Sequence, residues 1–198
     1  MQYFELSFLI LAGGKSSRMG VNKAELDFNG QTFLETLITK AQKLGFTDII
    51  ISGYPHKTAS ITPVMDEFIN RGPLGGLYSS FKVAKHPYCF VLCVDVPQLT
   101  EQVITSLIDY HFENKNELTL LRQNDRIEPL IGIYPASSYQ KIYPLIKNGS
   151  ASVFRLIDQY DYSIFDINNN DQIAANINTP EDYQHVLKKN LLSITNKK

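Results

Sequence analysis

The sequence predicts an α/β fold with a mostly parallel β-sheet, and three observations support this prediction. Strand-like runs alternate with amphipathic helical runs at the spacing of βαβ units, beginning with a strand over 6–12 and a helix over 32–44. The next strand, over 48–52, contains three consecutive isoleucines, a short β-branched run typical of a strand covered on both faces. The chain has 198 residues, of which 43% are hydrophobic, so it is long enough to bury a substantial core.

The first half of the chain shows this alternation most clearly. Gly45 is suited to the position just after a helix, Pro73 favours a helix start, and Thr100 is a suitable N-cap. We expect strands over 6–12, 48–52, 61–65 and 88–94, and helices over 32–44, 73–85 and 100–112.

The second half is less regular. Thr179 as N-cap, Pro180 at the first helical position and two acidic residues after it predict a strong helix start. The segment 115–126 is compatible with either a mobile flap or a plain hairpin. We expect strands over 118–122, 127–134 and 162–167, and helices over 136–146 and 150–159. Because no repeat or linker is visible, we expect a single domain over residues 1–198.

The charge balance and the cysteines exclude several functional classes. The formal net charge is -1, so no overall field attracts nucleic acid or an anionic membrane. The sequence contains no run of about 20 apolar residues, so no membrane span is predicted. The apolar N-terminal segment lacks the features expected of a secretory leader. Cys89 and Cys93 would lie about 13 Å apart on one strand, too far for a disulfide. We therefore expect buried, reduced thiols in a cytoplasmic protein.

The chain lacks the usual signals of nucleophilic catalysis. It contains no cysteine–histidine ligand cluster and no G-x-S-x-G motif. The histidines, His56, His86, His111 and His185, stand on predicted loops or helix faces, and we expect them to be solvated surface residues. A reaction that needs charge neutralisation and alignment but no protein nucleophile fits best, and nucleotidyl or phosphoryl transfer is such a reaction.

The clearest candidate site follows the first strand. The apolar run stops at Gly13 and Gly14, and a basic segment with Lys15, Arg18 and Lys23 comes next. Glycines let backbone N–H groups approach an anion, so the segment predicts a polyphosphate-binding loop, although paired glycines after a strand can also form a plain tight turn. The spacing is neither that of a P-loop nor G-x-G-x-x-G, which disfavours a kinase or a dinucleotide dehydrogenase.

Two acidic residues also fall at the ends of predicted strands. Ligands collect at the carboxyl ends of strands in an open sheet, so Asp66 and Asp95 should face the glycine loop. Asp95 directly follows an apolar strand, where an isolated carboxylate would be costly to desolvate. It is either a magnesium ligand or a turn acid before Pro97, and its position alone does not separate the two.

The segment 11–23, LAGGKSSRMGVNK, resembles the L-A-G-G-x-S-x-R-M-G-x-x-K signature of molybdenum cofactor guanylyltransferases. Later blocks are similar to that family too, and together they cover nearly the whole chain: Asp66, 72–76 (GPLGG), 93–97 (CVDVP), 128–134 (EPLIGIY) and 176–182 (NINTPED). The resemblance implies a three-layer α/β sandwich of the nucleotide-diphospho-sugar transferase-like (Rossmann-like) type. It also implies transfer of GMP from GTP to the molybdopterin cofactor, with Mg²⁺ required and pyrophosphate released.

The resemblance also implies roles for individual residues. Lys23 would contact the phosphates, Arg18 the triphosphate, and Asp95 would hold the metal; these three form the expected catalytic group. The residues expected to contact the nucleotide, the metal or the pterin are Leu11, Ala12, Gly13, Gly14, Lys23, Asp66, Asp95, Asn176 and Asn178. Within that set, Asp66 would bind the guanine nucleotide, and the two asparagines are associated with the pterin side. The chain departs from some members at Ser52-Gly53, where an asparagine is common, so that contact is in doubt.

Other functions remain open at this stage. A cytidylyltransferase of the same fold typically reads L-A-A-G at the loop, so Gly13 favours guanine. A sugar-phosphate nucleotidylyltransferase would normally need a longer chain. A non-catalytic nucleotide-binding protein that delivers cofactor is the third alternative, but the presence of both Lys23 and Asp95 argues against it. Transient contacts with cofactor-donating proteins and molybdoenzymes are expected. The segment 128–130 could be strand-edge packing or a substrate wall.

Overall fold

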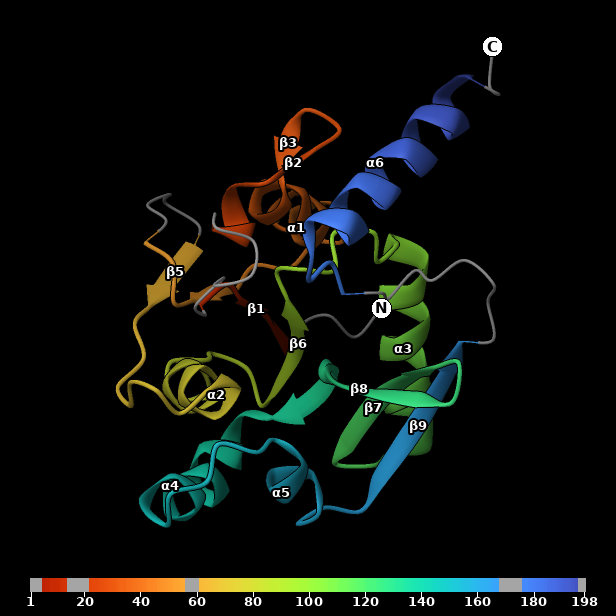
Figure 1. Ribbon diagram of the computed structural model, residues 1–198. Coiled ribbons are helices and arrows are strands. Elements are labelled where there is room, and N and C mark those ends of the chain that lie inside the picture. Colours follow the sequence, from red (N-terminus) through yellow and green to blue (C-terminus); the bar gives the residue numbers. More distant parts are fainter. Residues whose placement is uncertain (1–4, 14–21, 56–60, 168–175, 196–198) are drawn as a thin grey trace.

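A β-sheet organises the computed structural model, which describes residues 5–13, 22–55, 61–167 and 176–195. Within these residues the sheet has seven strands in the order β5-β4-β1-β6-β8-β7-β9 (Figure 1). Their bounds are β1 Leu6–Leu11, β4 Ile49–Ser52, β5 Ile61–Val64, β6 Tyr88–Cys93, β7 Leu118–Gln123, β8 Arg126–Pro135 and β9 Tyr162–Ile167. Strand β8 runs antiparallel to β6 and β7, and the other pairs are parallel, so the predicted mostly parallel sheet is confirmed.

Helices cover both faces of this sheet, which makes the predicted three layers (Figure 1). The helices of the described residues are α1 Phe33–Lys43, α2 Pro73–Phe81, α3 Glu101–Asn114, α4 Tyr139–Lys147, α5 Phe154–Ile157 and α6 Pro180–Thr195, with short 3₁₀ helices η2 Lys23–Glu25 and η3 Ala136–Ser138. Phe8 and Ile10 of β1 belong to the core shared with α1, α3 and α6, whereas Leu9 and Leu11 belong to the core shared with α2, α4 and α5. Successive side chains of β1 therefore pack alternately into the two cores, one on each face of the sheet.

The predicted helix ends are confirmed where local side chains determine them. Thr32 and Glu35 form a reciprocal capping box at the start of α1, and Gly45 has φ 87° just after its end. The Thr100 hydroxyl accepts the N–H of Val103 at the start of α3. All the strands predicted from the sequence are present, within about two residues at each end.

The structure differs from the sequence prediction in three elements. Helix α2 ends at Phe81 rather than at 85, because the buried carboxylate of Asp48 accepts the N–H of Lys85 at 3.0 Å and draws the chain out of the helix. The helix expected over 150–159 is shorter in the structure and is present as α5, Phe154–Ile157. A hairpin of β2 Asp27–Phe28 and β3 Gln31–Thr32 was not predicted, although its Asn29-Gly30 turn, with both φ angles positive, is a strong hairpin signal.

The hairpin alternative for 115–126 is the correct one. Strands β7 and β8 pair around Asn124 and Asp125, whose φ angles are 50° and 62°. Such a turn matches the twist of the two strands.

The expectation that every histidine is a surface residue is wrong for His111. Its side chain is only 2% exposed, because α3 packs it against β7, where its Nδ1 lies 2.8 Å from the Thr119 hydroxyl. Burial lowers the pKa of His111 to about 4, so the ring is neutral at pH 7. Cys89 and Cys93 are both free, as predicted; Cys89 is buried and Cys93 is partly buried. No helix in the described parts of the chain is long and apolar enough to cross a membrane.

Candidate functional site

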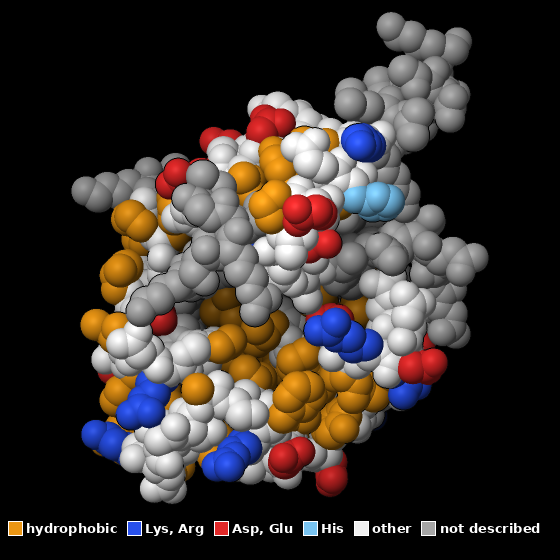
Figure 2. Space-filling view, in the orientation of Figure 1, with side chains coloured by type: hydrophobic (Ala, Val, Ile, Leu, Met, Phe, Trp, Pro, Cys, Tyr) orange, Lys and Arg blue, Asp and Glu red, His pale blue; other side chains and the backbone are white. Residues whose placement is uncertain are grey.

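The carboxyl ends of β1, β4 and β6 meet at one edge of the sheet and carry the predicted residues. The N–H of Ala12 donates to Ser52 O at 2.9 Å, and the N–H of Val94 donates to Leu11 O at 3.0 Å, so the three strand ends are held together by their backbones. In the space-filling view the surface is hollowed over β1 and β6, and hydrophobic side chains form the floor of the hollow (Figure 2). Ligands bind at this edge in open α/β sheets.

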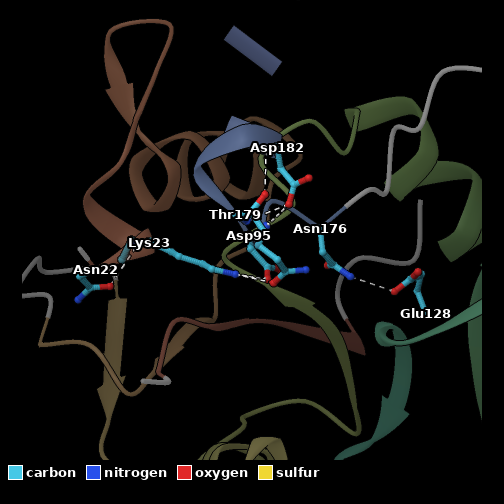
Figure 3. A network of polar contacts seen from close by, with 9 residues as sticks. Asn22, Lys23, Asp95, Glu128, Asn176, Thr179 and Asp182 are labelled. Atoms are coloured by element: carbon cyan, nitrogen blue, oxygen red, sulfur yellow. Dashed lines mark hydrogen bonds and ion pairs between the residues drawn. The ribbon is translucent and has the colours of Figure 1, made fainter. Parts of the chain in front are cut away.

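Lys23, Asp95 and Asn178 form the centre of the site. The Lys23 ammonium lies 3.0 Å from Asp95 Oδ2 (Figure 3) and donates to Asn178 Oδ1 at 2.7 Å. The side chains of Lys23 and Asp95 are each 16% exposed, so this ion pair is partly shielded from water. The three residues come from distant parts of the chain, and they place a cation between two oxygen acceptors.

The loop after β6 is fixed from two sides. Asp95 O accepts the N–H of Ile177 at 2.9 Å, which ties the 176–178 segment to this loop. The Lys40 ammonium of α1 donates to the carbonyls of Pro97 and Leu99 at 2.5 and 2.8 Å. Burial lowers the pKa of Lys40 to about 8, with Glu101 opposing the shift. These contacts hold the Asp95 backbone in place.

Asp95 has one carboxylate oxygen without a partner. Its Oδ1 is buried and accepts no hydrogen bond from any described residue, whereas Oδ2 receives the Lys23 ammonium. Buried polar atoms are normally satisfied, so this oxygen is suited to accept a hydrogen bond from water or to bind a ligand. It is compatible with the ligand-binding role expected for Asp95.

Glu128 also belongs to this network, although sequence analysis left the segment 128–130 open between strand-edge packing and a substrate wall. Its Oε2 accepts Asn176 Nδ2 at 3.2 Å (Figure 3), and its Oε1 lies 3.3 Å from Arg126 Nε. Burial raises the pKa of Glu128, Arg126 and Asn176 oppose the shift, and the nearby charge of Asp95 adds to it. An acidic residue within the otherwise apolar strand β8 was the signal available in the sequence.

Asp66 follows the carboxyl end of β5, at the same edge of the sheet. Its Oδ1 accepts the Ser52 hydroxyl at 3.1 Å, and burial raises the pKa of Asp66 while this hydrogen bond lowers it. Helix α2 begins beside it: a Cβ added at Gly76 would lie 2.6 Å from Ser52 Oγ and 3.5 Å from Asp66 Oδ1. Ser52, at the position where an asparagine is common, therefore orients Asp66.

Gly13 packs against Gly53 rather than standing in open space. A Cβ at Gly53 would lie 2.4 Å from Gly13 Cα, and a Cβ at Gly13 would lie 3.1 Å from Gly53 Cα. Leu11 and Ala12 are buried. Gly14, Lys15 and Arg18 lie outside the described residues.

Comparisons with known proteins point to one family. The sequence pattern of the MobA-like NTP transferase domain matches residues 8–162. A probable molybdenum cofactor guanylyltransferase of Carboxydothermus hydrogenoformans is 32% identical over 194 residues, covering 92% of this chain and 95% of that protein.

Solved structures share the fold. Molybdopterin-guanine dinucleotide biosynthesis protein A of Archaeoglobus fulgidus superposes with a TM-score of 0.75 at 18% identity, over 91% of this chain and 96% of its own. Rv0371c of Mycobacterium tuberculosis, solved in complex with manganese, superposes with a TM-score of 0.69 at 15% identity, over 93% of this chain and 98% of its own. The three-layer sandwich is thus the nucleotide-diphospho-sugar transferase-like fold expected from the sequence.

Proposed function

The chain belongs to the MobA-like NTP transferase family, and we propose from this premise that it is a molybdenum cofactor guanylyltransferase. It would transfer GMP from GTP to the terminal phosphate of the molybdopterin cofactor and release pyrophosphate. The observation that carries the proposal is the cluster of Lys23, Asp95 and Asn178 at the carboxyl ends of β1 and β6. Both substrates of this reaction are anions, so the site needs a positive charge that screens their repulsion. The Lys23 ammonium, held between two oxygen acceptors, supplies such a charge.

The described residues fit a divalent cation. Asp95 offers a buried oxygen without a partner, and the nearby amide oxygens of the asparagines are hard donors of the kind that Mg²⁺ and Mn²⁺ prefer. Among the described residues no three His, Cys, Asp or Glu side chains cluster, so a metal here would take one carboxylate and complete its shell from amide oxygens, substrate phosphates and water. Such an ion supplies charge neutralisation at the transferring phosphate. The manganese complex of the Mycobacterium tuberculosis neighbour is consistent with this.

No protein nucleophile is required. The second pKa of a phosphate monoester is about 6, so the acceptor phosphate is largely dianionic at neutral pH and can attack the α-phosphorus of GTP directly. The bond between the α-phosphorus and the bridging oxygen breaks, and pyrophosphate leaves. The protein holds the two anions in line and screens their charges, which is the main source of catalysis in such transfers.

Among the described residues, Lys23 supplies positive charge to the reaction. In the structure its ammonium contacts Asp95 and Asn178. We assign it to the phosphates of GTP during the reaction, where its charge stabilises the leaving pyrophosphate. Arg18 and the backbone of the glycine loop would assist from the same side, as the resemblance implies.

Asp66 would contact the guanine nucleotide from the other part of the edge. Ser52 holds one oxygen of its carboxylate, and Gly75 and Gly76 let α2 approach closely, because a Cβ at either position would lie 3.5 Å from an Asp66 oxygen. Gly13 would contribute to the choice of guanine through its close packing on Gly53, because an alanine there would push the ends of β1 and β4 apart. Asn176 and Asn178 would face the pterin side of the same cleft.

The proposal includes the setting of the reaction. GTP and a reduced pterin are cytoplasmic compounds, so we place the enzyme in the cytoplasm. Its product has to reach a molybdoenzyme, and transient contacts with the cofactor donor and the recipient are part of the proposal.

The deciding experiment supplies the purified protein with molybdopterin, Mg²⁺ and one of GTP, CTP, UTP or ATP, and measures pyrophosphate release. We expect turnover with GTP alone. Lys23→Met should reduce turnover by a factor on the order of 100 or more, because one preorganised charge contact of this kind contributes that much. Lys43→Met is the matched control, since Lys43 is an exposed lysine of α1, and it should leave turnover unchanged.

Turnover with CTP alone would instead identify a cytidylyltransferase. Binding of GTP without any pyrophosphate release would support a non-catalytic role in cofactor delivery.

A further inference from the structure

We propose that Glu128 is a positioning residue that sets the orientation of the Asn176 side chain, so that the amide oxygen of Asn176 joins Asp95 in holding the divalent cation. The inference rests on the proposed function, because it concerns the cation of that site. It adds a residue, Glu128, that acts through another side chain and does not itself touch the cation.

The first step is the direction of the Asn176 amide. A carboxylate only accepts hydrogen bonds, so the group that Asn176 turns toward Glu128 has to be its NH₂. The structure shows this arrangement, with Nδ2 3.2 Å from Oε2 (Figure 3). The amide oxygen consequently faces away from Glu128.

The second step is the rigidity of Glu128. Its side chain is 12% exposed and lies on the part of β8 that pairs with β7, where Glu128 is opposite Leu121. Its second oxygen is engaged by Arg126, a residue that is 76% exposed. A carboxylate on a paired strand defines the amide orientation better than a loop residue would.

The third step links Asn176 to Asp95. The N–H of Ile177 donates to Asp95 O, and the Ile177 side chain is buried in the core. Side chains on either side of a buried residue in an extended segment point to the opposite face, so Asn176 and Asn178 both face the site. Asn178 already presents its oxygen to the Lys23 ammonium, which demonstrates how an asparagine oxygen meets a cation here.

Together these contacts tie the 176–178 segment to the loop that carries Asp95, whose buried Oδ1 has no hydrogen-bond partner among the described residues. Residues that orient metal ligands through hydrogen bonds typically change metal affinity by about 10-fold to 100-fold when they are replaced. Glu128 would belong to this class.

The test is a double-mutant cycle on Mn²⁺ binding, measured without nucleotide by the electron paramagnetic resonance signal of free Mn²⁺. Glu128→Gln keeps the size of the side chain, but its amide can present NH₂ as readily as oxygen, so the orientation of Asn176 is no longer dictated. We expect Mn²⁺ affinity to fall by about 10-fold in Glu128→Gln. In an Asn176→Ala background, the same substitution should change affinity by less than about 2-fold, because the residue through which Glu128 acts is gone.

The alternative is that the negative charge of Glu128 attracts the cation directly. In that case Glu128→Gln would weaken Mn²⁺ binding equally in both backgrounds, and the proposal would be overturned. It would also be overturned by unchanged affinity in the single variant, or by a lack of Mn²⁺ binding to the unaltered protein. Glu113→Gln, which removes an exposed carboxylate of α3, controls for net charge and should have no effect.

Glu128→Ala repeats the cycle in case the glutamine variant is destabilised, and thermal unfolding of each variant confirms folding. Because neither GTP nor molybdopterin is present, the cycle is independent of the nucleotide choice and of the transfer itself. A failure of guanylyl transfer in the four-nucleotide assay would leave this result intact, and the reverse also holds.

Discussion

Gly53→Ala should destabilise the protein far more than a glycine-to-alanine change at another positive φ. Gly53 has φ 75°, and an alanine in the left-handed region costs roughly 1–2 kcal/mol. The new Cβ would also lie 2.4 Å from Gly13 Cα and 2.8 Å from Gly13 N. Both atoms are backbone, so the ends of β1 and β4 must separate, and overpacking of this kind costs about 1–3 kcal/mol more. We expect a total of about 3 kcal/mol.

Gly45→Ala is the matched control. Gly45 has φ 87°, but a Cβ there would meet nothing within 4 Å, so the substitution carries the conformational cost alone. For a chain of this length 1 kcal/mol shifts the thermal unfolding midpoint by about 2–4 °C. Calorimetry should therefore show a loss of about 6–12 °C for Gly53→Ala, from about 3 kcal/mol, and about 2–8 °C for Gly45→Ala, from about 1–2 kcal/mol. Equal losses would refute the close packing of Gly13 on Gly53, and with it the proposed route from Gly13 to the choice of base.

Two further predictions concern charge. Lys23→Met should tighten Mn²⁺ binding to the nucleotide-free protein several-fold, because the ammonium competes with the metal for Asp95 Oδ2, whereas weaker Mn²⁺ binding would contradict that competition. The pKa of His111 is about 4 in the folded protein and 6.5 ordinarily, so between pH 6.5 and pH 4 the unfolded chain binds more protons than the folded protein. The free energy of unfolding should therefore decrease as the pH falls from 6.5 toward 4. His111→Gln should flatten this slope in urea unfolding, while substitution of the exposed His185 should not.

Much of the site was predictable because its residues stand where local rules operate. Lys23, Asp66 and Asp95 follow strands or a glycine-rich turn, and parallel strands place such positions at one edge of a sheet. The capping residues Thr32 and Thr100 act within one helical turn, so their pattern is visible in a few neighbouring letters.

Other features depend on contacts that no short pattern contains. The Glu128–Asn176 hydrogen bond joins residues 48 positions apart, one on β8 and the other in the segment before α6. His111 was predicted to be exposed, but its place on the face of α3 that packs against β7 buries it. Both outcomes follow from strand order and helix rotation, which sequence periodicity does not define.

The sequence by itself determined the α/β class and the mostly parallel sheet. It also determined that a site with basic and carboxylate side chains follows β1 and β6. These properties follow from periodicity and from the residue types at strand ends. Only the tertiary structure decided that Lys23 rests on Asp95 and Asn178, that Gly13 needs Gly53 opposite it, and that Glu128 faces Asn176. Each is a contact of a few ångströms between distant segments, and such contacts are decided by strand register and by the packing of whole elements.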